Sequence, residues 1–268
     1  MNFGYFDYIR QEANFPPVDP QWLEWFVGFC EAQGSFSLSE YSPGFVLTCE
    51  DESVLKMIQN TLGIGKVSHD DTYRWKVQEM MELRQLIGLL SDNMVLSYRV
   101  EGLNSLIDLW NNFYINRYGE LVDSILIEKV STVLLPSLAS AWLSGFTDGC
   151  GSFSLTSQNR NGSLLWKWRA RLQKTQAQEV FVHLATLFGF PSSSVSSRKG
   201  RQGPIPQLTF PTSKLDSVAH YYQEHPLKVK GASLNRYLQS RAVYLDCKAN
   251  KVSPDNKLLV LAKQINSK

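Results

Sequence analysis

WFVGFCEAQGSFSL, at Trp25–Leu38, returns 117 residues later as WLSGFTDGCGSFSL, at Trp142–Leu155. The two stretches agree at eight of their fourteen positions. A second pair of similar stretches, Leu96–Asn104 and Leu227–Asn235, follows in the same order with an offset of 131 residues. Ordered repeats at this spacing indicate two halves of similar architecture, with longer hairpins in the second half.

Each repeat predicts a helix followed by a strand. Asp19 and Pro20 are typical of a helix N-cap and first helical residue, and Gly34 is expected to end that helix. Pro136 and the serine after it are expected to open the second helix, which ends at Gly151. After each glycine, serines alternate with Phe and Leu, which is the period of a half-buried strand.

The rest of each half predicts further helices and hairpins in the same order. In the first half we expect helices at 54–62 and 79–90 around a hairpin at 66–77. In the second half we expect helices at 177–188 and 213–223 around a hairpin at 194–210. The predicted organisation is an N-terminal extension at 1–18, a first half at 19–115, a linker at 116–135, a second half at 136–247 and a tail at 248–268 that ends in a docked helix.

Both repeat helices carry small residues four positions apart, Gly28 with Ala32 and Gly145 with Gly149. Residues at this spacing share one helical face, and small side chains allow two backbones to approach closely. We therefore expect these four residues to form the interface between the halves. The alternative is that each glycine lies beside an unrelated bulky side chain.

The segments FVGFCEAQG and LSGFTDGCG resemble the two LAGLIDADG motifs of single-chain homing endonucleases and related intron maturases. GSFSL after each motif and HPLKVK at residues 225–230 strengthen the resemblance, which covers about residues 19–245. It implies an α+β monomer with pseudo-two-fold symmetry. Each αββαββα half would contribute a four-stranded antiparallel sheet, and the two sheets would form a saddle over nucleic acid. Mitochondrial or plastid residence follows only from the habit of the family.

The eighth position of each motif departs from the family, in which an acidic residue there binds a divalent metal ion. This chain has Gln33 and Cys150 at these positions. A neutral amide and a soft thiol are poor ligands for Mg²⁺. Glu31 and Asp148 lie two residues earlier, about 200° around the helix, so we expect them to point away from the centre. The sequence therefore predicts no metal, no cofactor and no enzymatic activity.

The family also tends to place basic residues near the centre, after its third helix. The second half has Lys228 and Lys230 there, whereas the first half has Ser97 and Arg99 at the corresponding positions. One of two basic residues therefore remains in the first half.

Charge is distributed unevenly along the chain. Residues 1–120 contain 8 Lys and Arg against 17 Asp and Glu, a net charge of −9, and residues 121–268 contain 19 against 8, a net charge of +11. This asymmetry favours phosphate binding by the second half and leaves the acidic first half for possible protein partners. The alternative is chance combined with solvated faces. No apolar run is long enough to cross a membrane.

Basic residues in the second half are predicted to form the nucleic-acid surface. Alternation in a strand at 164–174 places three of them on one face, and others follow at its end, at a hairpin tip and after the third helix. They are Lys167, Arg169, Arg171, Lys174, Arg198, Lys199, Arg201, Lys228 and Lys230. The first half offers only Arg74 and Lys76 in a comparable strand, beside the acidic turn at Asp70 and Asp71. An ordinary solvated strand edge is the alternative.

These observations favour a catalytically inactive LAGLIDADG-like protein that binds RNA, either rRNA in an organellar ribosome or intron RNA during splicing. Shape and phosphate recognition suffice for many RNA ligands. A site-specific homing DNA endonuclease with a divergent or inactivated metal site is the second hypothesis. A decaying endonuclease with no present role is the third.

Overall fold

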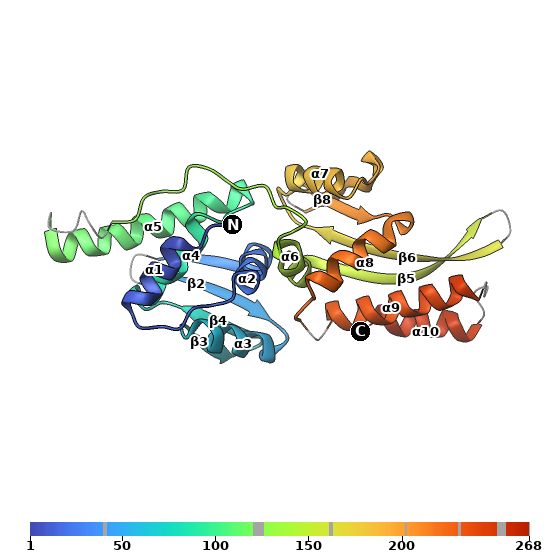
Figure 1. The fold of residues 1–268 in the computed structure, drawn as a ribbon, viewed down its shortest axis with the longest axis horizontal. Helices are drawn as coiled ribbons and strands as arrows, with labels where there is room; N and C mark the ends of the chain where they lie inside the picture. The colour runs from blue at the N-terminus through green and yellow to red at the C-terminus, as the bar shows by residue number, and fades with distance from the viewer. Residues whose placement is uncertain are drawn as a thin grey trace. The chain divides into compact units, whose positions relative to one another are not determined.

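Each half of the chain folds around one four-stranded antiparallel sheet, as the sequence predicts (Figure 1). The computed structural model describes residues 1–39, 42–119, 126–160, 163–201, 203–229, 232–250 and 256–267. For residues 158–160, 163–168, 232, 233, 256 and 267 it describes the backbone alone. The chain divides into two compact units, Met1–Phe146 and Thr147–Lys268.

The first unit has sheet order β1-β2-β4-β3, and helices α2, α3 and α5 contact this sheet. Its elements are α1 (Gly4–Glu12), α2 (Pro20–Gln33), β1 (Gly34–Ser39), β2 (Ser42–Cys49), α3 (Glu52–Leu62), β3 (Lys66–His69), β4 (Tyr73–Val77), α4 (Met80–Ser91) and α5 (Ser97–Tyr118). Phe45, Leu47 and Trp75 point from the strands into the core and are fully buried. Strand alternation therefore leaves the opposite face of the sheet polar.

The predicted start of the first repeat helix is present in α2. The carboxylate of Asp19 accepts a hydrogen bond from the Trp22 N–H at 3.1 Å, and Pro20 takes the first helical position. Gly34 ends the helix by entering the strand with extended backbone, at φ −70°. A Cβ there would lie 2.2 Å from Cζ of Phe45 and 2.6 Å from the carbonyl oxygen of Cys30. A side chain at Gly34 would therefore collide with the core.

The N-terminal extension contains α1, a helix that the sequence analysis did not predict. Arg10 at its end is almost fully buried and donates hydrogen bonds to the carbonyl of Leu62 at 2.7 Å and of Pro16 at 2.8 Å. Helix α1 packs against α4, where a Cβ on Gly88 would meet Ile9 at 2.9 Å. This close contact makes the extension part of the first core.

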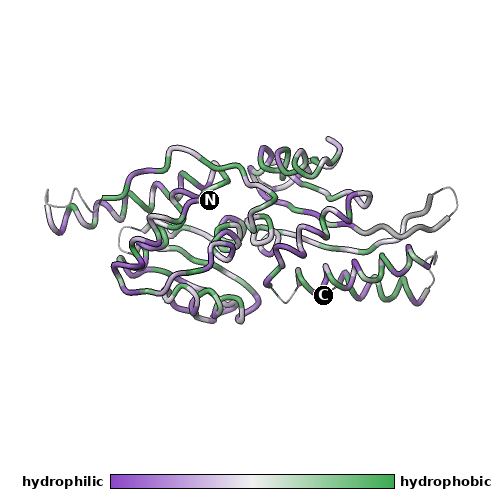
Figure 2. The backbone as a smooth tube through the Cα atoms, viewed as in Figure 1, coloured by the Kyte–Doolittle hydropathy of each residue, from purple (hydrophilic) through white to green (hydrophobic). Residues whose placement is uncertain are grey.

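The second unit repeats the pattern with sheet order β5-β6-β8-β7, contacted by α7, α9 and α10. Its elements are α6 (Trp142–Cys150), β5 (Gly151–Arg160), β6 (Ser163–Gln173), α7 (Gln178–Leu187), β7 (Val195–Gly200), β8 (Gly203–Phe210), α8 (Leu215–Glu224), α9 (Ala232–Ala249) and α10 (Asn256–Ser267). Figure 2 shows hydrophobic and hydrophilic residues interspersed along both units. Among the described residues, no helix is both long and apolar enough to span a membrane.

The second repeat helix begins later than predicted. Helix α6 starts at Trp142 and not at the serine after Pro136. Its first turn is capped by Ser140, whose Oγ accepts from the Trp142 N–H at 3.2 Å, and by Glu24 of α2, whose carboxylate accepts from the Ala141 N–H at 2.9 Å. The prediction failed because one of the two caps comes from a residue 117 positions earlier in the chain.

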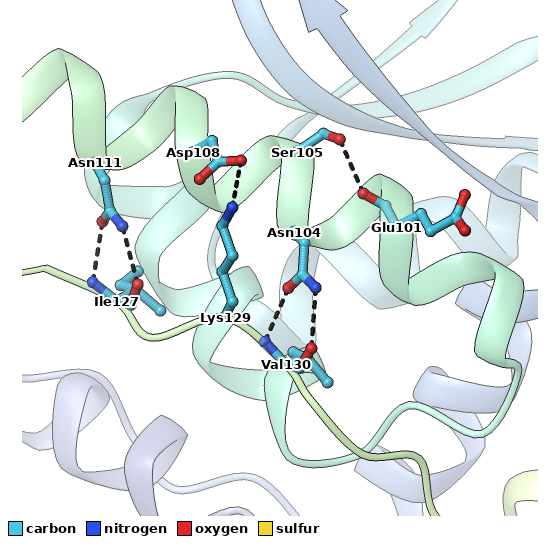
Figure 3. Close-up of polar contacts among 8 residues, drawn as sticks. All are labelled: Glu101, Asn104, Ser105, Asp108, Asn111, Ile127, Lys129 and Val130. Atoms are coloured by element: carbon cyan, nitrogen blue, oxygen red, sulfur yellow. Dashed lines mark hydrogen bonds and ion pairs between the residues drawn. The ribbon is translucent and has the colours of Figure 1, made fainter.

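The described part of the predicted linker is bound along one face of α5 (Figure 3). The side-chain amide of Asn104 donates to the carbonyl and accepts from the N–H of Val130, and that of Asn111 does the same with Ile127, at 2.8 to 3.0 Å. Lys129 forms an ion pair with Asp108 between them at 2.9 Å. Seven helical residues rise about 10 Å, which matches about three residues of extended chain. The segment is thus held in register with the helix.

The docked helix predicted in the tail is α10, which covers the outer edge of β5. Asn266 accepts from the Leu155 N–H at 3.1 Å and donates to its carbonyl at 2.9 Å. This amide therefore satisfies the backbone N–H and C=O of Leu155 on the edge strand.

Candidate nucleic-acid interface and motif centre

The first motif helix and the start of the second cross at two glycines within the first unit. A Cβ on Gly28 would lie 2.0 Å from the carbonyl oxygen of Trp142, and one on Gly145 would lie 1.7 Å from that of Trp25. Backbone therefore contacts backbone, and no side chain larger than hydrogen fits at either position. Ala32, one turn beyond Gly28, is also buried. Gly149, one turn beyond Gly145, is partly exposed and belongs to the second unit.

The two motif acids are structural. Glu31 is 1% exposed and accepts hydrogen bonds from the Val95 N–H at 3.0 Å, the Leu96 N–H at 2.7 Å and the Trp142 indole at 2.7 Å. Burial raises its pKa to about 7, and the three hydrogen bonds act against that shift. In the second unit the carboxylate of Asp148 accepts from the Lys228 N–H at 2.7 Å. Each acid therefore fixes the segment that leads into the last long helix of its repeat.

The eighth motif positions carry neutral groups. Gln33 is exposed at the end of α2. Burial raises the pKa of the Cys150 thiol to about 12, although the nearby Lys174 and a backbone hydrogen bond from Gln173 both lower it. At neutral pH the sulfur therefore remains a protonated thiol. These two groups do not fit a hard divalent ion held by paired carboxylates.

Arg99 caps the first motif helix. Its Nη2 donates to the carbonyl of Cys30 at 2.9 Å and to that of Gly34, and its guanidinium lies 5.3 Å from the centre of the Phe36 ring. Of the corresponding residues in the second unit, Lys228 is partly exposed and Lys230 lies outside the described residues. The repeat aligns Arg99 with Lys230, but no local sequence signal predicts its capping role.

The polar face of the second sheet carries a cluster of three arginines, Arg169, Arg171 and Arg198. Arg169 and Arg171 lie two residues apart on β6, opposite Ser154 and Ser152 of β5, and Arg198 comes from β7. Burial lowers the pKa of Arg171, and the positive charges of the other two lower it further. Among the described residues, no carboxylate forms an ion pair with any of the three. The cluster therefore suits an anionic ligand.

The remaining basic residues predicted for this surface are dispersed. Alternation along β7 turns Lys199 to the face opposite Arg198, so the predicted tip cluster is divided, and Arg201 lies exposed in the turn beyond. Lys174 follows the end of β6, near Cys150. The backbone of Lys167 pairs with Thr156, and its side chain lies outside the described residues.

A chain of amides that was not among the predicted site residues lies beside the arginines. Gln173 donates through Nε2 to Oε1 of Gln207 at 2.6 Å, and Gln207 donates through Nε2 to Oγ1 of Thr209 at 3.0 Å. Register between β6 and β8 brings them together, since Gln173 lies opposite Gln207 and Arg171 opposite Thr209. Polar residues alternating along both strands were the only signal in the sequence.

The first sheet carries more basic side chains than predicted. Lys66 of β3 lies opposite Lys76 of β4, and Arg74 shares their face two residues away. Arg74 forms an ion pair with Asp70 at 2.9 Å, and Lys66 lies 4.0 Å from Glu79. The acidic turn thus neutralises part of this face. Lys66 was missed because its register with Lys76 depends on the hairpin.

Comparisons with known proteins connect this geometry to one family. The model of the LAGLIDADG endonuclease family matches residues 143–244. "Probable intron-encoded endonuclease 4" of Neurospora crassa is 28% identical over 253 residues, which are 90% of this chain. The chain spans 43% of the length of that relative.

Solved structures show the same fold. The LAGLIDADG meganuclease I-CpaMI bound to uncleaved DNA matches with a TM-score of 0.64 and 17% identity, over 94% of this chain and 99% of that one. I-SmaMI bound to uncleaved DNA in the presence of calcium ions gives a TM-score of 0.64 at 15% identity, over 94% and 98% of the two chains. I-GzeII in complex with its DNA target gives 0.62 at 14% identity, over 93% and 97%.

These findings correct the prediction that this chain is not an enzyme. That prediction is wrong, because the matching family model describes endonucleases, the relative is named an endonuclease, and the fold is that of meganucleases. Residues 143–244 thus match the LAGLIDADG endonuclease family model, and both halves of the chain have the fold of LAGLIDADG meganucleases.

Proposed function

We propose that this protein is a site-specific duplex-DNA-binding protein of the LAGLIDADG endonuclease class, with its strongest phosphate contacts in the second unit. The observation that carries the proposal is the arginine cluster of Arg169, Arg171 and Arg198 on the polar sheet face, which has no carboxylate partner among the described residues. Guanidinium groups on a sheet bind phosphates and base edges in the major groove.

Charge supports this assignment. Residues 1–146 contain 9 Lys and Arg against 19 Asp and Glu, a net charge of −10, and residues 147–268 contain 18 against 6, a net charge of +12. Duplex DNA is a dense line of negative charge, so the second unit is attracted to it and the first is repelled. Three solved structures of similar fold are described as bound to DNA, which supports DNA as the ligand here.

The experiment is a selection of bound duplexes from a random-sequence library by the full-length protein. We expect one sequence to be enriched and to bind far more tightly than a scrambled duplex. The selected duplex is then incubated with the protein and Mg²⁺, and cleavage is read directly on a gel. A library from which no duplex is enriched would overturn the proposal.

RNA is a second candidate. It is favoured because, among the described residues, the arginine cluster without ion pairs lies on the second sheet, whereas Arg74 and Lys66 of the first sheet face carboxylates. An RNA ligand, such as rRNA or intron RNA, can be gripped by one basic surface through its shape and phosphates. Crosslinking in the native cell, followed by sequencing of both nucleic acids, separates the candidates. A defined RNA bound more tightly than the selected duplex would favour a structural or RNA-folding role.

A further inference from the structure

Strands β2 and β6, which occupy the same place in the two sheets, differ at three aligned positions on the face opposite the core. The repeat offset pairs Ser35 with Ser152, and the residues opposite these serines are Val46 on β2 and Arg171 on β6. Two residues closer to the motif helix along each strand, Thr48 of β2 corresponds to Gln173 of β6. Two residues farther from the motif helix, Gly44 of β2 corresponds to Arg169 of β6. Strand β2 thus presents Gly, Val and Thr where β6 presents Arg, Arg and Gln.

The side chain of Gln173 on β6 is held in place before any ligand binds. In the described hydrogen bonds Gln173 uses one amide hydrogen on Gln207, and Gln207 is fixed in turn by Thr209. The carbonyl oxygen and the other amide hydrogen of Gln173 are left to meet a ligand. A side chain that is already ordered loses less entropy on binding.

Arg171 has an unsatisfied donor beside this chain. Its Nε is buried and donates to no atom of the described residues. The guanidinium is only partly exposed and lies opposite Thr209, at the end of the amide chain.

A guanidinium and an amide read different bases in the major groove. Arginine donates two hydrogen bonds to O6 and N7 of guanine, whereas glutamine donates to N7 and accepts from N6 of adenine. Phosphate offers only acceptors, so it makes no use of the carbonyl oxygen of Gln173. A side-chain pair that offers both chemistries on neighbouring positions of one strand therefore matches base edges better than the DNA backbone.

We propose that sequence readout is concentrated in the second unit, where Arg171 reads a guanine and Gln173 reads a neighbouring adenine. The first sheet, where Asp70 and Glu79 neutralise part of the basic face, reads little sequence. This inference rests on the proposed duplex-DNA binding and assigns the source of its specificity.

The test repeats the library selection with Arg171→Ala and Gln173→Ala, and with the matched first-sheet variants Val46→Ala and Thr48→Ala. We expect Arg171→Ala to lose about tenfold or more of its preference for guanine at one position. Gln173→Ala should lose a similar preference for adenine at a neighbouring position. The two first-sheet variants should enrich the wild-type sequence.

Arg171→Lys is a second test of the same side chain, in case Arg171→Ala folds poorly. Lysine retains the positive charge but not the planar fork of donors, so it should bind with near wild-type affinity and still lose the guanine preference. Equal changes in preference from Val46→Ala and Arg171→Ala would overturn the inference. A uniform loss of affinity across all sequences in Arg171→Lys would do the same. In both cases duplex binding stands, whereas a selection that enriches nothing defeats the proposed function itself.

Discussion

The carboxylate of Glu31 accepts a hydrogen bond from the indole N–H of Trp142 at 2.7 Å, in the interior of the first unit. The same carboxylate binds the backbone N–H groups of Val95 and Leu96. One side chain therefore joins the first motif helix, the first residue of α6 and the entry to α5. Its ionisation must influence the stability of all three.

Stability should fall with rising pH because of Glu31. Its pKa is raised from 4.5 to about 7, so the folded protein holds this proton more tightly than the unfolded chain. The associated stabilisation is complete below about pH 4.5 and is lost as the pH rises through about 7, amounting to a few kcal/mol at most. Glu31→Gln cannot titrate, and its amide nitrogen would face one of three N–H donors.

We expect urea unfolding to show the Gln variant less stable at pH 5, by about 1–3 kcal/mol for the unsatisfied donor. The difference in the free energy of unfolding between the wild type and Glu31→Gln should become smaller toward pH 8. Other titrating groups are shared and cancel in the difference. Parallel stability curves would show that Glu31 does not ionise in this range.

Gly145→Ala should destabilise the protein through its helix crossing. The added Cβ would lie 1.7 Å from the carbonyl oxygen of Trp25 and 2.9 Å from the backbone nitrogen of Phe29, so the helices must separate. We expect a loss of about 1–3 kcal/mol or more in the free energy of unfolding. Gly4→Ala is the control, because its Cβ would approach only Asn2, at 3.4 Å. Similar melting temperatures for the two variants would contradict this view of the crossing.

Reversing the charge of Arg169 and Arg198 should flatten the salt dependence of DNA binding. Each phosphate contact contributes about one unit to the slope of log affinity against log salt, so the double variant should lose about two. Arg74→Glu with Lys76→Glu is the matched pair in the first sheet. It should change the slope less, because Asp70 already neutralises Arg74 at 2.9 Å. Equal changes, measured by fluorescence anisotropy, would show that both sheets bind phosphate alike.

Asn104→Ala and Asn111→Ala should release the linker from α5. Each removes two part-buried hydrogen bonds, to the backbone N–H and C=O of one linker residue, at a cost of about 1–2 kcal/mol. Limited proteolysis should then cut residues 126–135 faster than in the wild type. Asn112→Ala, at an exposed neighbouring position, is the control. Unchanged cleavage in the double variant would mean that the side-chain amides do not hold the segment.

Features written in local sequence could be predicted. The repeated motifs, the Asp19 cap and the alternation after each glycine gave the helices and strands of both halves. Alternation in β6 also placed Arg169 and Arg171 on one face. The predicted boundaries at 116, 136 and 248 remain predictions.

Features that depend on distant contacts could not be predicted. Helix α6 is capped by Glu24 from far along the chain, so the Pro136 signal was misleading. Helix α1 has no side-chain cap, and packing on α4 sustains it. The amide chain from Gln173 to Thr209 exists only through the register of β6 with β8.

The division of α6 between the two units limits how this chain can be recombined. The part of α6 up to Phe146, which includes the fully buried Trp142 and Phe146, belongs to the first unit, and residues 147–150 belong to the second. In a hybrid joined at residue 136, the foreign second half would also replace Trp142 and Phe146, two aromatic side chains that belong to the retained first unit. Grafting a foreign second half therefore succeeds only when the donor brings a tryptophan and a phenylalanine to the same turns, or when the junction is placed after Phe146.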